Sequence, residues 1–293
     1  MKTFVNKLIL FLLIAVVTIV GTIALINNLV NKNASFKIDK VSSSIVLGHS
    51  HAECAYNDDY IKNTSNYAQS GESYLYTFIK ARQLIKDNPT IEHIYVEFTN
   101  DQIKLNKNDW IWGDNYLSDK YPKYAPFMTL KEQRLLLTHN FRGYMNVVSV
   151  ATNKNLLKLI NNKNDHTKII GGYKALDHQL DLDKITESEI ELAITTSKDS
   201  ISVHNVLYLK KLIDYCKEKE KKITLIRSPL HRKNNDRKNE DTFQRIRLEY
   251  FKDVEFLDFI DFPLEDTDFA DLEHLNSQGA IKFSAYIDNQ FNP

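Results

Sequence analysis

The chain has 293 residues, and its 38 basic and 38 acidic side chains leave a formal net charge of zero. A neutral chain has no long-range attraction to nucleic acid or anionic lipid, so overall charge argues against proteins that bind either one. Hydrophobic residues make up 43% of the chain and aromatic residues 11%, which are ordinary values for a globular core. The length suits one large or two small domains.

The first thirty residues differ from the rest. From Leu8 to Ile26 the chain carries no charge, and this run of about 19 residues is close to the length that a membrane-spanning helix needs. Lys2 and Lys7 precede it, as in a signal peptide, but the apolar run is longer than a signal peptide's core and no small-x-small cleavage site follows. We therefore predict an uncleaved transmembrane anchor over residues 1–30.

The side of the membrane on which the remaining chain lies is less well defined by the sequence. Lysines flank the apolar run on both sides, so the positive-inside rule does not decide the orientation. Long soluble domains translocate largely regardless of such charges. We expect a single-pass protein of the cell membrane whose soluble domain, after a polar linker over 31–43, lies on the extracytoplasmic side.

Beyond the linker, apolar runs and helical patterns alternate. Strands are expected at 45–47, 65–69, 93–99, 223–226 and 254–258. Helices are expected at 53–62, 73–86 and 277–291, the last with Ser277 as its N-cap. Such alternation predicts a three-layer α/β/α sandwich with a mostly parallel five-stranded sheet, occupying residues 44–293.

Residues 102–221 are too many for one crossover between strands. They contain helical patterns at 130–139, 143–160 and 204–219, and we interpret them as a helical insertion that forms a lid or subdomain over the carboxyl edge of the sheet. Its aromatic residues are expected mainly in the insertion's own core, although some could stack on sugars; they include Trp110, Trp112, Tyr116, Tyr121 and Tyr124.

Residues that could carry chemistry follow four of the expected strands, where open α/β sheets bind their ligands. Ser50 follows Gly48 at the end of the first strand and is a candidate nucleophile whose own N–H could bind an oxyanion; alternatively it caps the next helix. Gly71 after the second strand and Asn100 after the third could supply further oxyanion donors, or could simply form turns.

After the fifth strand, Asp271 and His274 lie three residues apart. In a turn, the carboxylate of Asp271 could accept the Nδ1–H of His274, which would leave Nε2 free to act as a base. The alternative is a solvated loop with an unrelated histidine.

Other histidines and the cysteines have competing interpretations. His49 and His51 have a spacing that metal ligands use, and with Glu53 nearby and His231 and Asp271 on other strand ends they could form a metallohydrolase site. His49, His51 and His231 could instead line a pocket. Cys54 is expected to be a buried residue, and no spacing requires that it pair with Cys216.

Together, the blocks around Ser50, Gly71, Asn100 and Asp271–His274 resemble the SGNH, or GDSL-like, hydrolase superfamily. The resemblance covers about residues 44–101 and 222–291, with two departures: His49 stands where that family has Asp, and Phe98 where it has Gly. An N-terminal anchor before such a domain is similar to the branch that contains the D-alanyl transfer protein DltD and the alginate O-acetyltransferases.

The resemblance implies acyl transfer through Ser50, with His274 as base, Asp271 as its partner, and oxyanion donors at Ser50, Gly71 and Asn100. It requires no cofactor and no metal. We expect a membrane-anchored esterase or O-acyltransferase that acts on carbohydrate-linked or polyol esters of the cell envelope, and that works beside a membrane-bound acyltransferase. The alternatives are a non-catalytic accessory protein of such an acyltransferase and a metal-dependent hydrolase that uses His49 and His51.

Overall fold

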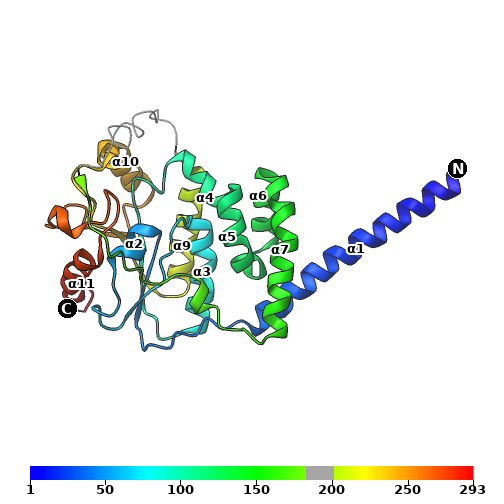
Figure 1. Ribbon diagram of the computed structural model, residues 1–293, viewed down its shortest axis with the longest axis horizontal. Coiled ribbons are helices and arrows are strands. Elements are labelled where there is room, and N and C mark those ends of the chain that lie inside the picture. The colour runs from blue at the N-terminus through cyan, green and yellow to red at the C-terminus, as the bar shows by residue number, and fades with distance from the viewer. Residues whose placement is uncertain (183–200, 293) are drawn as a thin grey trace.

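The computed structural model describes residues 1–182 and 201–292 and has an α/β domain at one end of a long N-terminal helix (Figure 1). The domain is built on five parallel strands in the order β2-β1-β3-β4-β5, which confirms the predicted sheet. The strands are β1 (Ser44–Leu47), β2 (Thr64–Asn66), β3 (His93–Glu97), β4 (Lys222–Arg227) and β5 (Glu255–Asp258).

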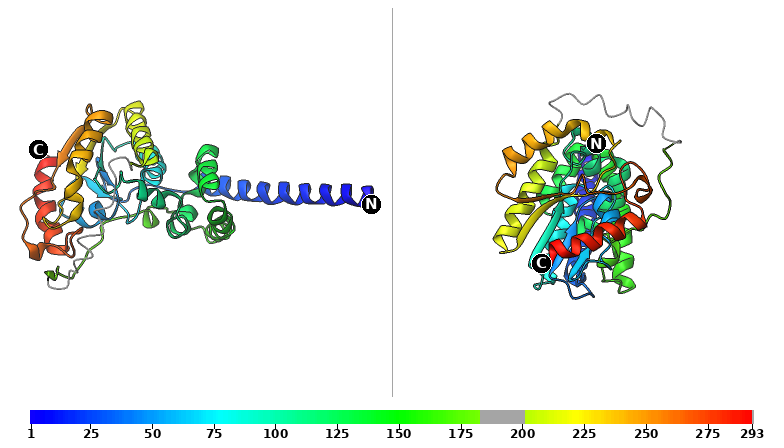
Figure 2. Two further views of the ribbon diagram at one scale, coloured as in Figure 1. Left: turned by 90° about the horizontal axis from the view of Figure 1, so that it is seen from above. Right: turned by 90° about the vertical axis from the view of Figure 1, so that its left-hand side faces the viewer.

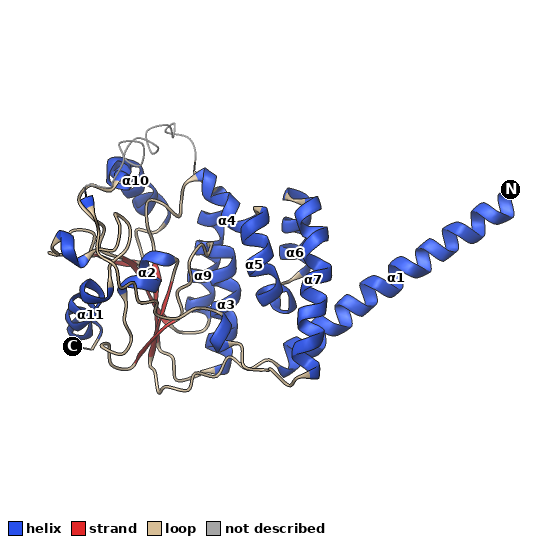
Figure 3. Cartoon of the chain, viewed as in Figure 1, coloured by secondary structure: helices blue, strands red, loops and turns tan. Residues whose placement is uncertain are grey.

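Side chains alternate between the two faces of the sheet and so define the layers. Ile45 and Leu47 of β1 pack against one set of helices, whereas Val46 of β1 and Tyr95 of β3 pack against the other. The first set comprises α3 (Tyr74–Asp87), α9 (Val203–Glu218) and α10 (Glu240–Tyr250), and the second comprises α2 (Ser50–Ala55) and α11 (Ser277–Phe291). The predicted three-layer sandwich is confirmed, and Figure 3 shows the strands between the helices.

Several boundaries differ from those expected. The helix predicted at 53–62 is α2, which starts at Ser50 and ends at Ala55, because the chain turns at Asn57 to hydrogen-bond α11 through the Ser284 hydroxyl. The second strand stops at Asn66, whose amide donates to two carbonyl oxygens of the α2 region. Ser277 is not the cap of α11; the Asn276 side chain accepts the first free N–H groups instead.

A stack of short and long helices fills the connection from β3 to β4 (Figure 1). Helix α9 packs on α3 and forms the crossover to β4. The predicted insertion, 102–221, therefore included one helix that belongs to the layer beside the sheet. The insertion's elements are η1 (Leu105–Asn108), α4 (Asp109–Trp112), α5 (Asp114–Tyr124), η2 (Ala125–Phe127), α6 (Leu130–His139), α7 (Phe141–Ile160) and η3 (Thr167–Ile169).

Helix α1 (Lys2–Asn33) projects from the domain beside α7 (Figures 1 and 2). Its most apolar window has a mean hydropathy of 3.0 and is almost wholly exposed, so by length and composition α1 is able to span a membrane. Only its last turns pack against the domain, where Ile26 and Val30 are buried. The segment after it is not a free linker, since Phe36 is buried and packs edge-on against Phe127 at 5.0 Å between ring centroids.

Candidate active site

Ser50 is held by a sharp turn between β1 and α2. The turn requires glycine at position 48, because a Cβ there would lie 2.6 Å from the Glu97 Cβ. His49 has extended backbone angles and is the N-cap of α2, so Ser50 is the first helical residue and not its cap. The Ser50 side chain is thereby free to face the carboxyl edge of the sheet, as a nucleophile after strand one requires.

Ser50 and His274 are joined by a hydrogen bond of 2.8 Å between Ser50 Oγ and His274 Nε2. The other ring nitrogen of His274 lies 2.9 Å from the nearer carboxylate oxygen of Asp271. Asp271 also accepts the backbone N–H groups of Glu273 at 2.7 Å and His274 at 2.8 Å, which fixes the carboxylate within its turn. The three predicted residues therefore form a connected Ser–His–Asp chain across 224 positions of sequence.

The electrostatics of this chain suit proton transfer. Burial lowers the pKa of His274, but the hydrogen bond and charge of Asp271 more than offset it and leave the pKa above the usual 6.5. Burial raises the pKa of Asp271, and its hydrogen bond to His274 outweighs that and holds the pKa below its ordinary value. Asp271 thus stays ionised and orients the imidazole, whose Nε2 faces Ser50 Oγ.

Gly71, which the sequence suggests as a second backbone donor, lines the same cleft as Ser50. It has a φ of +61°, which favours glycine, and a Cβ at this position would lie 2.5 Å from the Tyr116 ring. In the described part of the chain, neither the Ser50 N–H nor the Gly71 N–H has a hydrogen-bond partner. Both groups are therefore available to a developing oxyanion.

The backbone of Ser70, the residue before Gly71, is held from two sides. The Ser70 N–H donates to Glu53 Oε2 at 3.0 Å, and the Lys120 ammonium of the insertion donates to the Ser70 carbonyl at 2.8 Å. On the other side, buried Glu72 pairs with buried Lys80 at 2.8 Å. These contacts fix the turn that presents the Gly71 N–H, and the sequence patterns had indicated none of them.

Asn100, the third predicted oxyanion donor, is not brought to Ser50. Its amide nitrogen donates to the Asp236 carbonyl at 3.2 Å, and its oxygen accepts from the Arg227 guanidinium at 2.9 Å. Arg227 is itself fixed by Glu240 and Asp258. This ionic network lies at the ends of β4 and β5 and holds the Asn100 amide on the far side of the Ser50 turn.

An open cleft of about 620 Å³ lies in front of Ser50. The insertion contributes Trp110 from α4 and Tyr116 from α5 to the cleft lining, whereas Tyr121 and Tyr124 are buried in the core. Residues around 174–178 and the Asp271 turn also contribute to the lining. The cleft's main lining residues are Ser50, Gly71, Trp110, Tyr116, Lys174 and His274.

The other side of the Ser50 turn is buried and contains three titratable residues. His49 Nε2 lies 3.1 Å from the Thr99 hydroxyl and 3.4 Å from Glu97 Oε2. Burial lowers the pKa of His51 to about 3 and lowers that of His49 well below its usual value. Burial likewise raises the pKa of Glu97 to about 7, although Ser228 donates to it at 2.5 Å. Glu97 was not predicted as a site residue. The sequence feature that could have indicated it is a lone carboxylate at the end of an apolar strand.

The ligand atoms of His49, His51 and Glu97 lie within 4.8 Å of one another, as metal ligands would. A catalytic metal needs an open coordination position, but these residues are buried and none of them lines the cleft. His231, predicted as a further ligand or pocket residue, instead contacts Asp266 at 3.1 Å. The arrangement therefore favours a structural role for this cluster.

The two cysteines are free and buried, and burial raises the pKa of each thiol to about 12. They do not pair, in keeping with the absence of any spacing that required it. Cys54 borders the cleft one turn after Ser50, but a protonated thiol is a poor nucleophile.

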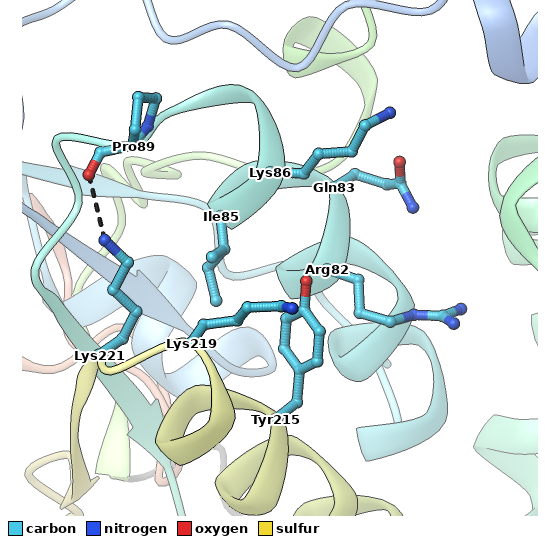
Figure 4. A pocket seen from close by; sticks show the side chains of 8 residues that line it. All are labelled: Arg82, Gln83, Ile85, Lys86, Pro89, Tyr215, Lys219 and Lys221. Carbon is cyan, nitrogen blue, oxygen red and sulfur yellow. Dashed lines mark hydrogen bonds between the residues drawn. The ribbon is translucent and has the colours of Figure 1, made fainter.

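A second hollow of about 460 Å³ lies between the C-terminal ends of α3 and α9 (Figure 4). It contains none of the residues of the Ser–His–Asp chain. Three of its basic side chains are already engaged: Lys221 donates to the Pro89 carbonyl at 3.1 Å, Lys219 pairs with Glu218, and Arg82 pairs with Glu132. We assign no chemistry to it.

Comparisons with known proteins give limited information. A family model that bears no functional description matches residues 172–293, and no curated protein matches the chain. Among solved structures, the chain is similar to a candidate acylhydrolase from Bacteroides fragilis, with a TM-score of 0.40, 10% identity and coverage of 89% of this chain and 92% of that chain. A GDSL-like lipase from Bacteroides thetaiotaomicron has a TM-score of 0.40, 9% identity and coverage of 89% and 92%. Similarities this weak carry no functional argument.

Proposed function

We propose that the protein is a membrane-anchored serine esterase or O-acyltransferase that works through an acyl-Ser50 intermediate. The observation that carries the proposal is the hydrogen-bonded chain from Ser50 Oγ through His274 to Asp271, open to a cleft. A nucleophile, a base and a residue that orients the base are the arrangement that activates a serine hydroxyl.

The reaction follows from the positions of these groups. Ser50 Oγ attacks an ester carbonyl while its proton passes to His274 Nε2, and Asp271 stabilises the imidazolium that forms. The Ser50 and Gly71 N–H groups receive the developing oxyanion; one such donor lowers the activation barrier by about 3–4 kcal/mol. His274 then protonates the leaving alcohol, and the acyl group passes from Ser50 to water or to an acceptor hydroxyl.

A fluorophosphonate probe tests the serine mechanism directly. Folded wild-type protein should be labelled on Ser50, and the Ser50→Ala variant should not be. A folded wild-type protein that resists the probe would instead favour a non-catalytic accessory protein. Loss of ester hydrolysis with a chelator, restored by zinc, would favour the metal-dependent alternative at His49 and His51.

We propose carbohydrate-linked or polyol esters as substrates, with hydroxyl acceptors competing against water. The support is the insertion, which places Trp110 and Tyr116 at 6.0 Å between ring centroids in the cleft wall, where they could stack on a sugar. Product analysis with an acetyl ester in the presence of a glycan or glycerol would separate transfer from hydrolysis. Co-purification would test the proposed membrane-bound acyltransferase partner.

We propose that α1 is retained as an anchor and that the domain faces the extracytoplasmic side. Retention is supported by Ile26 and Val30, which are buried against the domain and would be lost with a cleaved signal sequence. The intact mass of the protein isolated from membranes tests retention. A reporter enzyme that is active only outside the cytoplasm, fused to the C-terminus, tests orientation.

A further inference from the structure

Helix α7 has an unusual outer face for a helix of a chain with no net charge. It contains three basic residues, Arg142, Lys154 and Lys158, and no acidic residue. One stripe of α7, made of Gly143, Val147, Ala151 and Asn155, is buried. Its exposed apolar side chains are Phe141, Met145, Val150, Leu156, Leu157 and Ile160.

Helix α7 lies where α1 leaves the domain (Figures 1 and 2). The Asn155 amide of α7 lies 3.4 Å from the Asn27 side chain of α1. Along α1, the side chains before Ile26 are mostly exposed, and the first buried ones are Ile26 and Val30. A bilayer that covers the exposed apolar part of α1 therefore ends near Asn27, at the level of the C-terminal half of α7.

We propose that the outer face of α7 rests on the anionic headgroups of the bilayer in which α1 is anchored. This inference rests on the proposed retention of α1. Apolar side chains combined with cations and no acids are the composition of helices that lie in a membrane interface. A protein partner would more often meet a face of mixed charge, whereas every charge on α7 is positive.

A group of lysines, Lys154 and Lys158 of α7 with the neighbouring Lys123, supports an anionic surface as the partner of this face. Burial, together with the nearby charges of Lys154 and Lys123, lowers the pKa of Lys158 to about 8. Of these, Lys123 pairs with Asp119 at 2.8 Å, while the structure shows no ion pair for Lys154 or Lys158 within its described residues. Lipid phosphates would supply the missing counter-charge.

The consequence concerns the active site. α5 packs against both α7 and α3, and it carries Tyr116 in the cleft wall. Contact between α7 and lipid would therefore hold the cleft at a fixed height and orientation above the membrane. A flexible tether alone would let the height and the orientation vary. This suits an enzyme that receives its acyl group from, or delivers it to, a component of the same membrane.

The test uses the full-length chain in vesicles that contain phosphatidylglycerol, an anionic lipid, and a headgroup-linked nitroxide. A fluorophore is attached to Leu157→Cys on α7, which is 57% exposed, or to the matched control Leu248→Cys on α10, which is 55% exposed and lies away from α1. Cys54 and Cys216 are buried and should not compete for the label. The lipid nitroxide should quench the Leu157 label about threefold more than the control.

Charge reversal sharpens the result. Lys154→Glu with Lys158→Glu should reduce quenching at Leu157 in these vesicles and have little effect in phosphatidylcholine alone. Equal weak quenching of both labels, with the Leu157 label open to a water-soluble quencher, would overturn the proposal. Failure of the chain to float with vesicles would overturn it together with α1 anchoring, whereas fluorophosphonate labelling of Ser50 in detergent tests the proposed chemistry independently of either result.

Discussion

The two sides of the Ser50 turn show how position alone gives histidines opposite roles. On the open side, His274 is hydrogen-bonded to ionised Asp271, and its pKa lies above the usual value. On the buried side, His49 and His51 lie behind the same turn, and burial lowers the pKa of both. The His49 and His51 rings are only 4.4 Å apart, and the His51 ring lies 5.3 Å from that of His274.

The comparison separates a base from supports. The base of the proposed reaction needs a pKa near the working pH, an orienting carboxylate and access to substrate; His274 contacts Asp271 and lines the cleft. His49 and His51 instead stay neutral at neutral pH, pack under the turn, and contact the strand that carries Glu97. We therefore expect substitutions on the open side to change the rate, and those on the buried side to change mainly the stability.

The largest effect is expected from His274→Gln, compared with His51→Gln as its matched control. Loss of the base should lower kcat/KM for p-nitrophenyl acetate roughly 10⁴-fold, whereas the control should change it less than about tenfold. Steady-state rates with equal amounts of folded protein measure both. A similar loss in the two variants would remove the distinction between the two sides of the turn.

Asp271→Asn should lower the rate roughly 10³-fold, because an amide neither stabilises the imidazolium nor fixes the tautomer. It should also shift the pH profile. The rate of the wild type rises with pH as His274 loses its proton, and Asp271 raises that pKa, so the variant's acidic limb should move to lower pH. An unchanged limb in the pH dependence of kcat/KM would show that Asp271 does not act through His274.

These expectations also show what the sequence could and could not specify. The buried strands and the Ser50, Asp271 and His274 positions were predictable, because apolar runs and short local motifs encode them. Asn100 was misplaced because its partner Arg227 lies 127 residues away and no local pattern records that contact. The contacts of Glu53 and Lys120 with Ser70 could likewise not be predicted, since the three residues come together only when the insertion packs beside the Ser70–Gly71 turn.

Gly71→Ala should lower the rate about 10²-fold, as expected when one oxyanion donor is misplaced. The added methyl group would meet the Tyr116 ring, and alanine disfavours a φ of +61°. The loss should appear in kcat more than in KM, because the donor acts on the transition state. The double variant with Tyr116→Ala removes the clash but not the backbone strain, so only partial recovery is expected; a Gly71→Ala variant with wild-type kcat would exclude this N–H from the oxyanion site.

The smallest effect is expected in the pH dependence of stability on the buried side. His51 has a pKa of about 3 when folded, below the usual 6.5, so its contribution is fully present above pH 6.5 and is lost as the pH falls toward 3. Between pH 7 and pH 5 this loss amounts to about 2 kcal/mol. His49 acts in the same direction. Glu97, with a pKa raised to about 7, acts in the opposite direction: it stabilises the fold at low pH and loses that contribution as the pH rises through 7.

The His51→Gln variant should lose only the part of this pH dependence that comes from His51. Urea unfolding of the full-length chain in detergent at pH 7 and pH 5 measures it. The exposed His139, replaced by Gln, is the control, and an equal change in both variants would show that burial behind the Ser50 turn is not the cause.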